Sequence, residues 1–344
     1  MPWSRFDSNY EAPAGDRDLS YCQAMREAID QAMQLDPRVF CIGLDADDKF
    51  GVFGSMSNLR HPERVLGTPI SENAMTGVAL GAALAGMRPI HVHLRNDFLL
   101  VAMDQIANYV AKWQDMFDHQ VKVPLVIRSI IGRGWGCGAQ HSQSLHGLFA
   151  QIPGLKVVMP SSPYDAKGLF LEAVKDDSPV LFLEHRWLYK NTGNVPETMY
   201  TLPFGRCNRL RAGNSLTVVA TSLAAIHALK ACEQQDLDVD LLDPRTVKPL
   251  DLDSIVASVQ RTGRLLVVDY DFPFGGFGAE VVAAVTERAF DSLRQPPQRM
   301  GFPDRGMPSS GRLERAYYPT PETIGATMRA MILGSSIGAD HFVL

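Results

Sequence analysis

The chain has 344 residues, of which 46% are apolar and 21% are charged, and its formal net charge is -5. This composition is ordinary for a globular protein with a large core, and the length suggests two domains of about 100–200 residues each. A mildly acidic chain gives no electrostatic reason to expect a nucleic acid or an anionic membrane as partner.

The five cysteines are scattered without paired spacing. This pattern favours free thiols in a reducing compartment over a disulfide framework or a zinc site. Residues 1–18 are polar and lack both the apolar core of a secretory signal and the acid-poor, Arg-rich pattern of a transit peptide. We therefore expect a cytoplasmic protein with a flexible N-terminus over residues 1–18.

Apolar residues at helical spacing predict a helix over Leu19–Leu35, and the apolar run Arg38–Leu44 predicts a buried strand. Three acids, Asp45, Asp47 and Asp48, follow this strand. They are either metal ligands or part of a solvated loop, and the loop is the favoured interpretation.

One carboxylate, Glu72, stands before the run Val78–Met87, which is apolar on every side and rich in small residues. Such a run predicts a helix that is buried all round. Ser71 can cap this helix while Glu72 only complements the helix dipole. The alternative is that Glu72 is a functional acid at the mouth of a buried helix.

The segment Arg88–Leu94 predicts a strand with His91 and His93 on one face. Without a third ligand nearby in the sequence, two polar strand positions are favoured over a metal site. Apolar residues in one stripe predict a helix over Leu99–Phe117.

A glycine-rich stretch, Gly132–Ala139, precedes the polar run Gln140–Ser144. Its Gly134-x-Gly136-x-x-Ala139 spacing fits a dinucleotide fingerprint only loosely, because the surrounding strand–turn–helix unit is missing. An imidazole such as His141 suits anion binding and proton transfer. A nucleophilic pair of His141 with Ser142 or Ser144 is a weaker alternative, since no Gly-x-Ser-x-Gly elbow surrounds either serine.

Strand and helix patterns alternate through both halves of the chain, which predicts an α/β protein of two doubly wound domains with parallel sheets. The aperiodic segment 191–206 is the expected linker. It separates a first domain over 19–190 from a second over 207–333, followed by a tail over 334–344.

Four motifs together resemble the beta subunit of thiamine-diphosphate-dependent 2-oxoacid dehydrogenases of the pyruvate and acetoin dehydrogenase kind. These motifs are Thr68–Glu72, Asp97–Phe98, Asp104–Ile106 and Gln140–Ser144. The resemblance runs from about Leu19 to Met331. It implies a pyrimidine-binding domain followed by a domain like the C-terminal domain of transketolase.

The resemblance also implies roles for individual residues. Glu72 would hydrogen-bond a ring nitrogen of the cofactor's aminopyrimidine and promote the tautomer that deprotonates the thiazolium carbon. His141 would contact the substrate carboxylate. Phe98 would stack on the aminopyrimidine ring, and Ile70 and Leu94 would also contact the cofactor. Gln140 and Arg95 would contact the substrate. The sequence departs from the family pattern at Leu44, Leu94 and Arg95.

The superfamily holds the cofactor's diphosphate through Mg²⁺ at a Gly-Asp-Gly motif, and the chain contains no such motif. We therefore expect no metal ligands in this chain. An alpha-type partner subunit would carry the diphosphate and the metal in an α2β2 assembly, and a lipoyl-bearing acyltransferase is a further candidate partner.

Three functions are consistent with this pattern. The first is decarboxylation of a pyruvate-like 2-oxoacid and transfer of the remaining fragment to an acceptor such as lipoamide. The second is a two-component transketolase-like or acyloin-forming carboligase. The third is a non-catalytic stabilising subunit, and the joint presence of Glu72, Phe98 and His141 argues against it.

Overall fold

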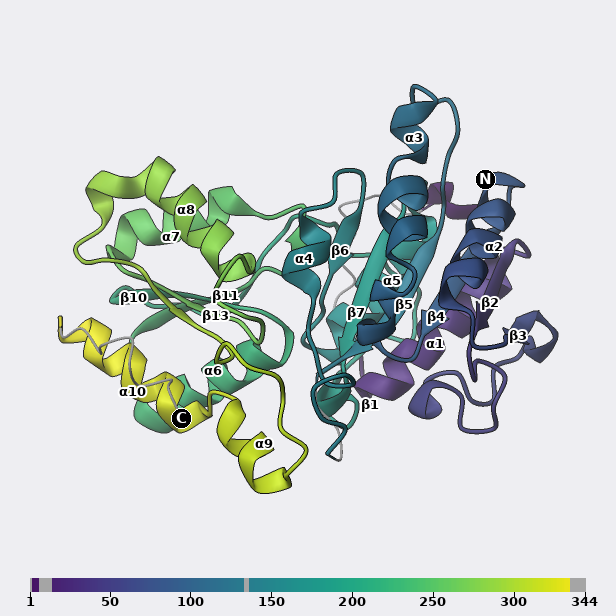
Figure 1. The fold of residues 1–344 in the computed structure, drawn as a ribbon. Coiled ribbons are helices and arrows are strands. Elements are labelled where there is room, and N and C mark those ends of the chain that lie inside the picture. Colours follow the sequence, from purple (N-terminus) through teal and green to yellow (C-terminus); the bar gives the residue numbers. More distant parts are fainter. Residues whose placement is uncertain (1, 6–13, 133–135, 335–344) are drawn as a thin grey trace. The chain divides into compact units, whose positions relative to one another are not determined.

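The computed structural model describes residues 2–5, 14–132 and 136–334, and these form two compact α/β units (Figure 1). The N-terminal unit comprises the chain up to Ile131 and Phe149–Phe204. The C-terminal unit comprises Gly132–Leu148 and the chain from Gly205 onward. Gly134 of the loose dinucleotide pattern and the tail beyond Gly334 lie outside the described residues.

The N-terminal unit alternates strands and helices along the chain. Its main elements are β1 (Asp18–Ser20), α1 (Tyr21–Leu35), β2 (Val39–Gly43), β3 (Val65–Gly67), α2 (Glu72–Leu84), β4 (Arg88–His93), η4 (Asn96–Leu100), η5 (Gln105–Val110), α3 (Trp113–Met116), β5 (Val126–Ile131), β6 (Lys156–Val158), α5 (Pro163–Lys175), β7 (Val180–His185) and β8 (Thr192–Asn194). Within the unit the central strands follow the order β6-β7-β5-β4-β2-β3, and each neighbouring pair is parallel.

The expected helix near the N-terminus is confirmed as α1. Ser20 and Gln23 form a capping box at its start, and its buried face includes Tyr21, Met25 and Ile29. This face packs against α5, whose first turn is capped by Ser162. The strands β4, β5 and β7 are buried along their whole length and form the centre of the core.

The helix expected to be buried on every side is α2, and that expectation is wrong for this chain. Only Thr76, Ala79, Leu80 and Ala83 are buried, on the side that packs against β4 and η5. Val78 is 52% exposed. In the single chain, the solvent-facing side of α2 also carries small apolar residues. The sequence pattern therefore did not reveal which side of the helix would be buried.

The continuous helix expected over Leu99–Phe117 is also wrong. The segment is divided into the 3-10 turn η4, the π-helical η5 and the single turn α3. The amide of Ala111 donates to the carbonyl of Ile106, five residues earlier, at 3.0 Å. A π turn inserts one extra residue and rotates the apolar stripe, so Ile106 and Val110 are buried whereas Phe117 is exposed.

The C-terminal unit contains a mainly parallel sheet with the strand order β14-β13-β10-β11-β9, in which only β9 is antiparallel to its neighbour among the described strands. Its elements are α4 (His146–Ala150, at the boundary of the units), β9 (Asn208–Arg211), β10 (Leu216–Ala220), α6 (Ser222–Gln235), β11 (Val239–Asp243), β12 (Thr246–Lys248), α7 (Leu252–Thr262), β13 (Leu265–Val268), α8 (Phe277–Ala289), β14 (Gln298–Met300), α9 (Gly311–Tyr317) and α10 (Pro321–Ile332). Figure 1 shows α7 and α8 on one face of this sheet and α6 and α10 on the other. The predicted class, two α/β domains with largely parallel sheets, is confirmed.

Across the described residues, no helix has both the length and the apolar character required to cross a lipid bilayer.

Candidate active site

A pocket lies just beyond the carboxyl ends of β2, β3 and β4. Because these strands are parallel neighbours, the segments that follow them meet at one edge of the sheet, where open α/β sheets bind ligands. The pocket holds about 300 Å³, open solvent at its mouth included. Its lining residues are Leu44, Thr68, Pro69, Ile70, Ser71, Glu72, Met75, His91, Val92, His93, Leu94 and Phe98.

Glu72 is the first residue of α2 and is half-buried at this pocket. Among the described residues, none donates a hydrogen bond to its carboxylate or forms an ion pair with it. Ser71 occupies the N-cap position, but its side chain makes no capping hydrogen bond, so the expected Ser71 cap is wrong. The Glu72 carboxylate is therefore available to a ligand.

The walls of the pocket are mostly apolar. Ile70, Leu94 and Phe98, which the sequence pointed to as cofactor contacts, line it together with Glu72. These four residues come from the β3–α2 connection, the start of α2 and the segment after β4. An aromatic ring and aliphatic side chains beside one carboxylate suit a flat heterocycle that carries a hydrogen-bonding nitrogen.

Two buried histidines, His91 and His93, line the pocket, and the buried Thr76 contacts both of them. The rings of His91 and His93 are 4.3 Å apart between centroids, which confirms that they share one face of β4. Nδ1 of His91 lies 3.1 Å from the carbonyl oxygen of Ile42, so Nδ1 carries the proton and Nε2 is an acceptor. Thr76 Oγ1 donates to the carbonyl oxygen of Glu72 at 2.7 Å, and it lies 3.1 Å from that Nε2 and 3.4 Å from Nε2 of His93.

Both imidazoles are held neutral. Burial lowers the pKa of His91 to about 4, although its hydrogen bond to Ile42 opposes the shift. Burial also lowers the pKa of His93 well below its usual range, and the neighbouring His91 adds to this effect. The sequence predicted that these histidines share one face of the strand but not that both would contact Thr76, because that contact depends on how α2 packs on β4.

Arg95, the candidate substrate-binding cation, is not among the residues that line the pocket. It is buried, which contradicts the alternative of a surface residue, and its Nε lies 3.6 Å from Oδ2 of Asp97. The acids Asp45, Asp47 and Asp48 do not converge on a metal position. Within the described ranges the only cluster of three potential metal-binding side chains is His146, Asp269 and Asp271, in the C-terminal unit.

His141 and Gln140 belong to the segment Gly132–Leu148, which packs with the C-terminal unit. Gln140 is exposed and His141 half-buried, and the His141 amide donates to the carbonyl of Gly138 at 3.4 Å. The hydroxyls of Ser142 and Ser144 are buried without a hydrogen-bond partner among the described residues. Neither serine therefore makes the hydrogen bond to His141 that a Ser–His nucleophile pair would use.

Comparison with known proteins assigns both units. Residues 17–192 match the family model of the transketolase pyrimidine-binding domain, and residues 205–324 match that of the transketolase C-terminal domain. The fold is similar to a solved structure described as a split-gene transketolase, inactive beta4 tetramer. The TM-score is 0.74 at 22% identity, covering 92% of this chain and 99% of that one.

Several relatives are similar over nearly the whole chain. The acetoin:2,6-dichlorophenolindophenol oxidoreductase subunit beta of Cupriavidus necator is 41% identical over 333 residues, covering 92% of this chain and 98% of the relative. The 2-oxoisovalerate dehydrogenase subunit beta of Bacillus subtilis is 38% identical, with 91% and 98% covered. The pyruvate dehydrogenase E1 component subunit beta of Rickettsia felis is 38% identical, with 88% and 94% covered.

The fold and the domain matches define a subunit of the transketolase-like, thiamine-diphosphate-dependent class. Within that class, the chain belongs to the family of beta subunits of 2-oxoacid dehydrogenase first components. The resemblance inferred from the sequence motifs is thus confirmed.

The neutral histidines predict an acid-sensitive fold. The unfolded chain binds a proton at His91 near pH 6.5 and the folded chain near pH 4. Stability contributed by the neutral ring is therefore present above pH 6.5 and lost as the pH falls toward 4, by up to roughly 3 kcal/mol. Urea unfolding measures the prediction. The difference in unfolding free energy between the wild type and His91→Asn should decrease as the pH falls from 6.5 to 4. His119→Asn, at an exposed histidine, is the control. Parallel pH profiles for the wild type and His91→Asn would contradict the assignment.

Proposed function

We propose that this chain is the beta subunit of an enzyme that decarboxylates a pyruvate-like 2-oxoacid and passes the remaining fragment to an acceptor such as lipoamide. The observation that carries the proposal is the Glu72 carboxylate, which has no partner among the described residues and lies beside Phe98 in an apolar pocket. Thiamine diphosphate, when bound, supplies the stabilisation of the substrate-derived carbanion.

The chain's own residues would bind the aminopyrimidine and control its protons. Glu72 would hold a proton at a ring nitrogen, and Phe98 would stack on the ring. Ile70 and Leu94 would exclude water from one edge. His141 and Gln140 remain the proposed substrate contacts. Arg95 is a weaker candidate than the sequence implied, because its charge is paired with Asp97.

We assign only the aminopyrimidine end of the cofactor to this pocket. Glu72 is the only acid among the residues that line the pocket. Mg²⁺ prefers several oxygen ligands in an octahedral arrangement, which this lining does not supply. We therefore assign the diphosphate and Mg²⁺ to an alpha-type subunit in an α2β2 assembly.

Several large apolar side chains that are exposed in the single chain support such a partner, since exposed apolar surface marks interaction sites. They lie on α2, on η5 and in the segments beside them. They are Ile70, Val78, Leu100, Val101 and Tyr109, each at least 40% exposed. The face of α2 that is unburied in the single chain would then be covered in the assembly.

The acceptor and the cellular location are further parts of the proposal. A lipoyl-bearing acyltransferase is the proposed acceptor protein for the 2-oxoacid reaction. A cytoplasmic location is supported by the five free cysteines, which fit a reducing compartment.

A second candidate function is cleavage or formation of an acyloin. It is favoured by the relatives named for acetoin oxidation, one 41% and another 40% identical to this chain. Both reactions need the same aminopyrimidine pocket, so product analysis with 2-oxoacid and with acetoin as substrates distinguishes them.

Replacing Glu72 tests the function directly. In the complex with the partner subunit, Glu72→Gln should fold normally and lose turnover by about 10²–10⁴-fold, because an amide cannot exchange the proton. Glu63→Gln, at an exposed acid of the same unit, should leave turnover unchanged. Ser71→Ala should cost little stability, since its side chain caps nothing. Turnover of Glu72→Gln within a few fold of the wild type, with cofactor bound, would refute the role.

Replacing Val78 tests the partner surface. Val78 is 52% exposed, so Val78→Asp should not unfold the isolated chain. It should weaken association with the alpha-type subunit by at least about tenfold, because a charge would be buried in the interface. Phe290→Asp, at an apolar residue of the C-terminal unit that is 70% exposed, is the control. Light scattering of co-expressed subunits measures both, and intact assembly with Val78→Asp would reject this surface.

A further inference from the structure

The segment that carries His141 is fitted closely to the C-terminal unit. A side chain added at Gly136 would place its Cβ 2.7 Å from the carbonyl oxygen of Ser309, and one added at Gly138 would place it 2.7 Å from Ser309 Oγ. Both glycines also have φ of +72°, which other residues rarely adopt. A Cβ added at Gly306 would lie 2.9 Å from that of Ala139. The glycines thus permit close backbone contact with the C-terminal unit.

The centre of this segment lies against aromatic residues of the same unit. Ser142 is 1% exposed, and it lines a small pocket with Ala139 and Gln143. The opposite wall consists of Phe272, Phe302, Gly306, Met307 and Tyr317. His141 is therefore flanked on both sides by residues that contact the C-terminal unit.

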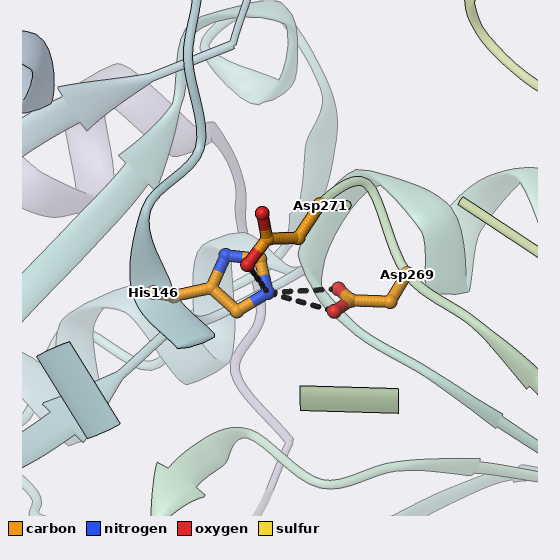
Figure 2. Close-up of side chains that lie close together, drawn as sticks. All are labelled: His146, Asp269 and Asp271. Carbon is orange, nitrogen blue, oxygen red and sulfur yellow. Dashed lines mark hydrogen bonds and ion pairs between the residues drawn. The ribbon is translucent and has the colours of Figure 1, made fainter. Parts of the chain in front are cut away.

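The segment ends in a buried ion triad. Nε2 of His146, the first residue of α4, lies 2.9 Å from both carboxylate oxygens of Asp269 and 3.8 Å from Oδ2 of Asp271 (Figure 2). Asp269 comes directly after β13, and all three side chains are almost fully buried. Gly147, next in the chain, donates its amide to Oδ2 of Asp271 at 3.2 Å.

The carboxylates of the triad are themselves held in place. Thr221 Oγ1 donates to Oδ1 of Asp269 at 2.5 Å, and the Phe272 amide donates to Oδ1 of Asp271 at 2.7 Å. Burial by itself would lower the pKa of His146, but the Asp269 and Asp271 charges outweigh it and raise the pKa to about 9. The protonated imidazole makes charge-assisted hydrogen bonds, which are stronger than neutral ones. Its proton occupies the position where a metal ion would have to bind.

We propose that His146, Asp269 and Asp271 anchor the segment Gly136–Ser144 to the C-terminal unit and thereby position His141 for the substrate. His146 is a positioning residue in this scheme, and the C-terminal unit contributes to turnover by fixing the loop. The kinetic part of the proposal rests on the proposed function, whereas the anchoring itself does not.

The test compares His146→Gln with a matched variant in the assembled, cofactor-loaded complex. Asp240→Asn is the match, because Asp240 is also fully buried in the C-terminal sheet and pairs with Arg209 at 3.0 Å and with Arg261. Hydrogen exchange of the amides in 136–148 reports anchoring, and the separation of kcat from KM reports positioning. The double variant His146→Gln/Asp269→Asn removes the imidazolium together with the carboxylate that it pairs with. It is included in case the single variant does not fold.

We expect His146→Gln to speed exchange in 136–148 by at least about tenfold and to lower kcat/KM for the 2-oxoacid by roughly 10–100-fold. Asp240→Asn should lower the unfolding midpoint without either change. Unchanged loop exchange in both His146 variants, or equal loop exchange in Asp240→Asn, would overturn the anchoring. Faster loop exchange with unchanged kcat/KM would overturn the positioning role. If the wild-type complex turns over neither a 2-oxoacid nor acetoin, the proposed function fails. The hydrogen-exchange data still decide whether the segment is anchored.

Discussion

The parallel pairing of β3, β2 and β4 is the constraint on which the site depends. It brings the segments that follow the carboxyl ends of these three strands to one edge of the sheet. Leu44, Ile70 and Leu94 therefore line the same pocket although they are far apart in the sequence. The packing of α2 on β4 then brings Glu72 into the same pocket as His91 and His93. A carboxylate that shares a pocket with neutral, buried imidazoles, and with no lysine or arginine among the described lining residues, is a site where a proton can be held at a ligand atom.

The C-terminal unit has a different task in this account. Its sheet delivers Asp269 and Asp271 at the end of β13, and these carboxylates hold His146 and the amide of Gly147. The same unit encloses Ser142 and accommodates Gly136 and Gly138 at close range. The segment with the proposed substrate-contacting histidine is therefore structurally a part of the C-terminal unit, although it lies within the first half of the sequence.

Much of the fold was predictable from local patterns, because helix and strand periodicities and caps such as Ser20 and Ser162 act within a few residues. The motif around Glu72 and Phe98 named residues that line one pocket, and their roles stay a prediction. The pattern failed where surfaces depend on distant contacts. The exposed face of α2 carries the same small apolar residues as a buried face would. The spacing of apolar residues does not reveal the π turn at Gln105–Val110. The His146–Asp269 pair joins residues 123 positions apart, which no local pattern can reveal.

The central claim is that this chain supplies only the aminopyrimidine end of the cofactor site. Titration calorimetry of thiamine diphosphate with Mg²⁺, on the isolated chain and on the complex with the alpha-type subunit, tests it most directly. We expect weak or no binding to the isolated chain and tight, magnesium-dependent binding of one cofactor per beta chain in the complex. Tight, magnesium-dependent binding of one cofactor to the isolated chain would contradict it, because the diphosphate site would then lie within this chain.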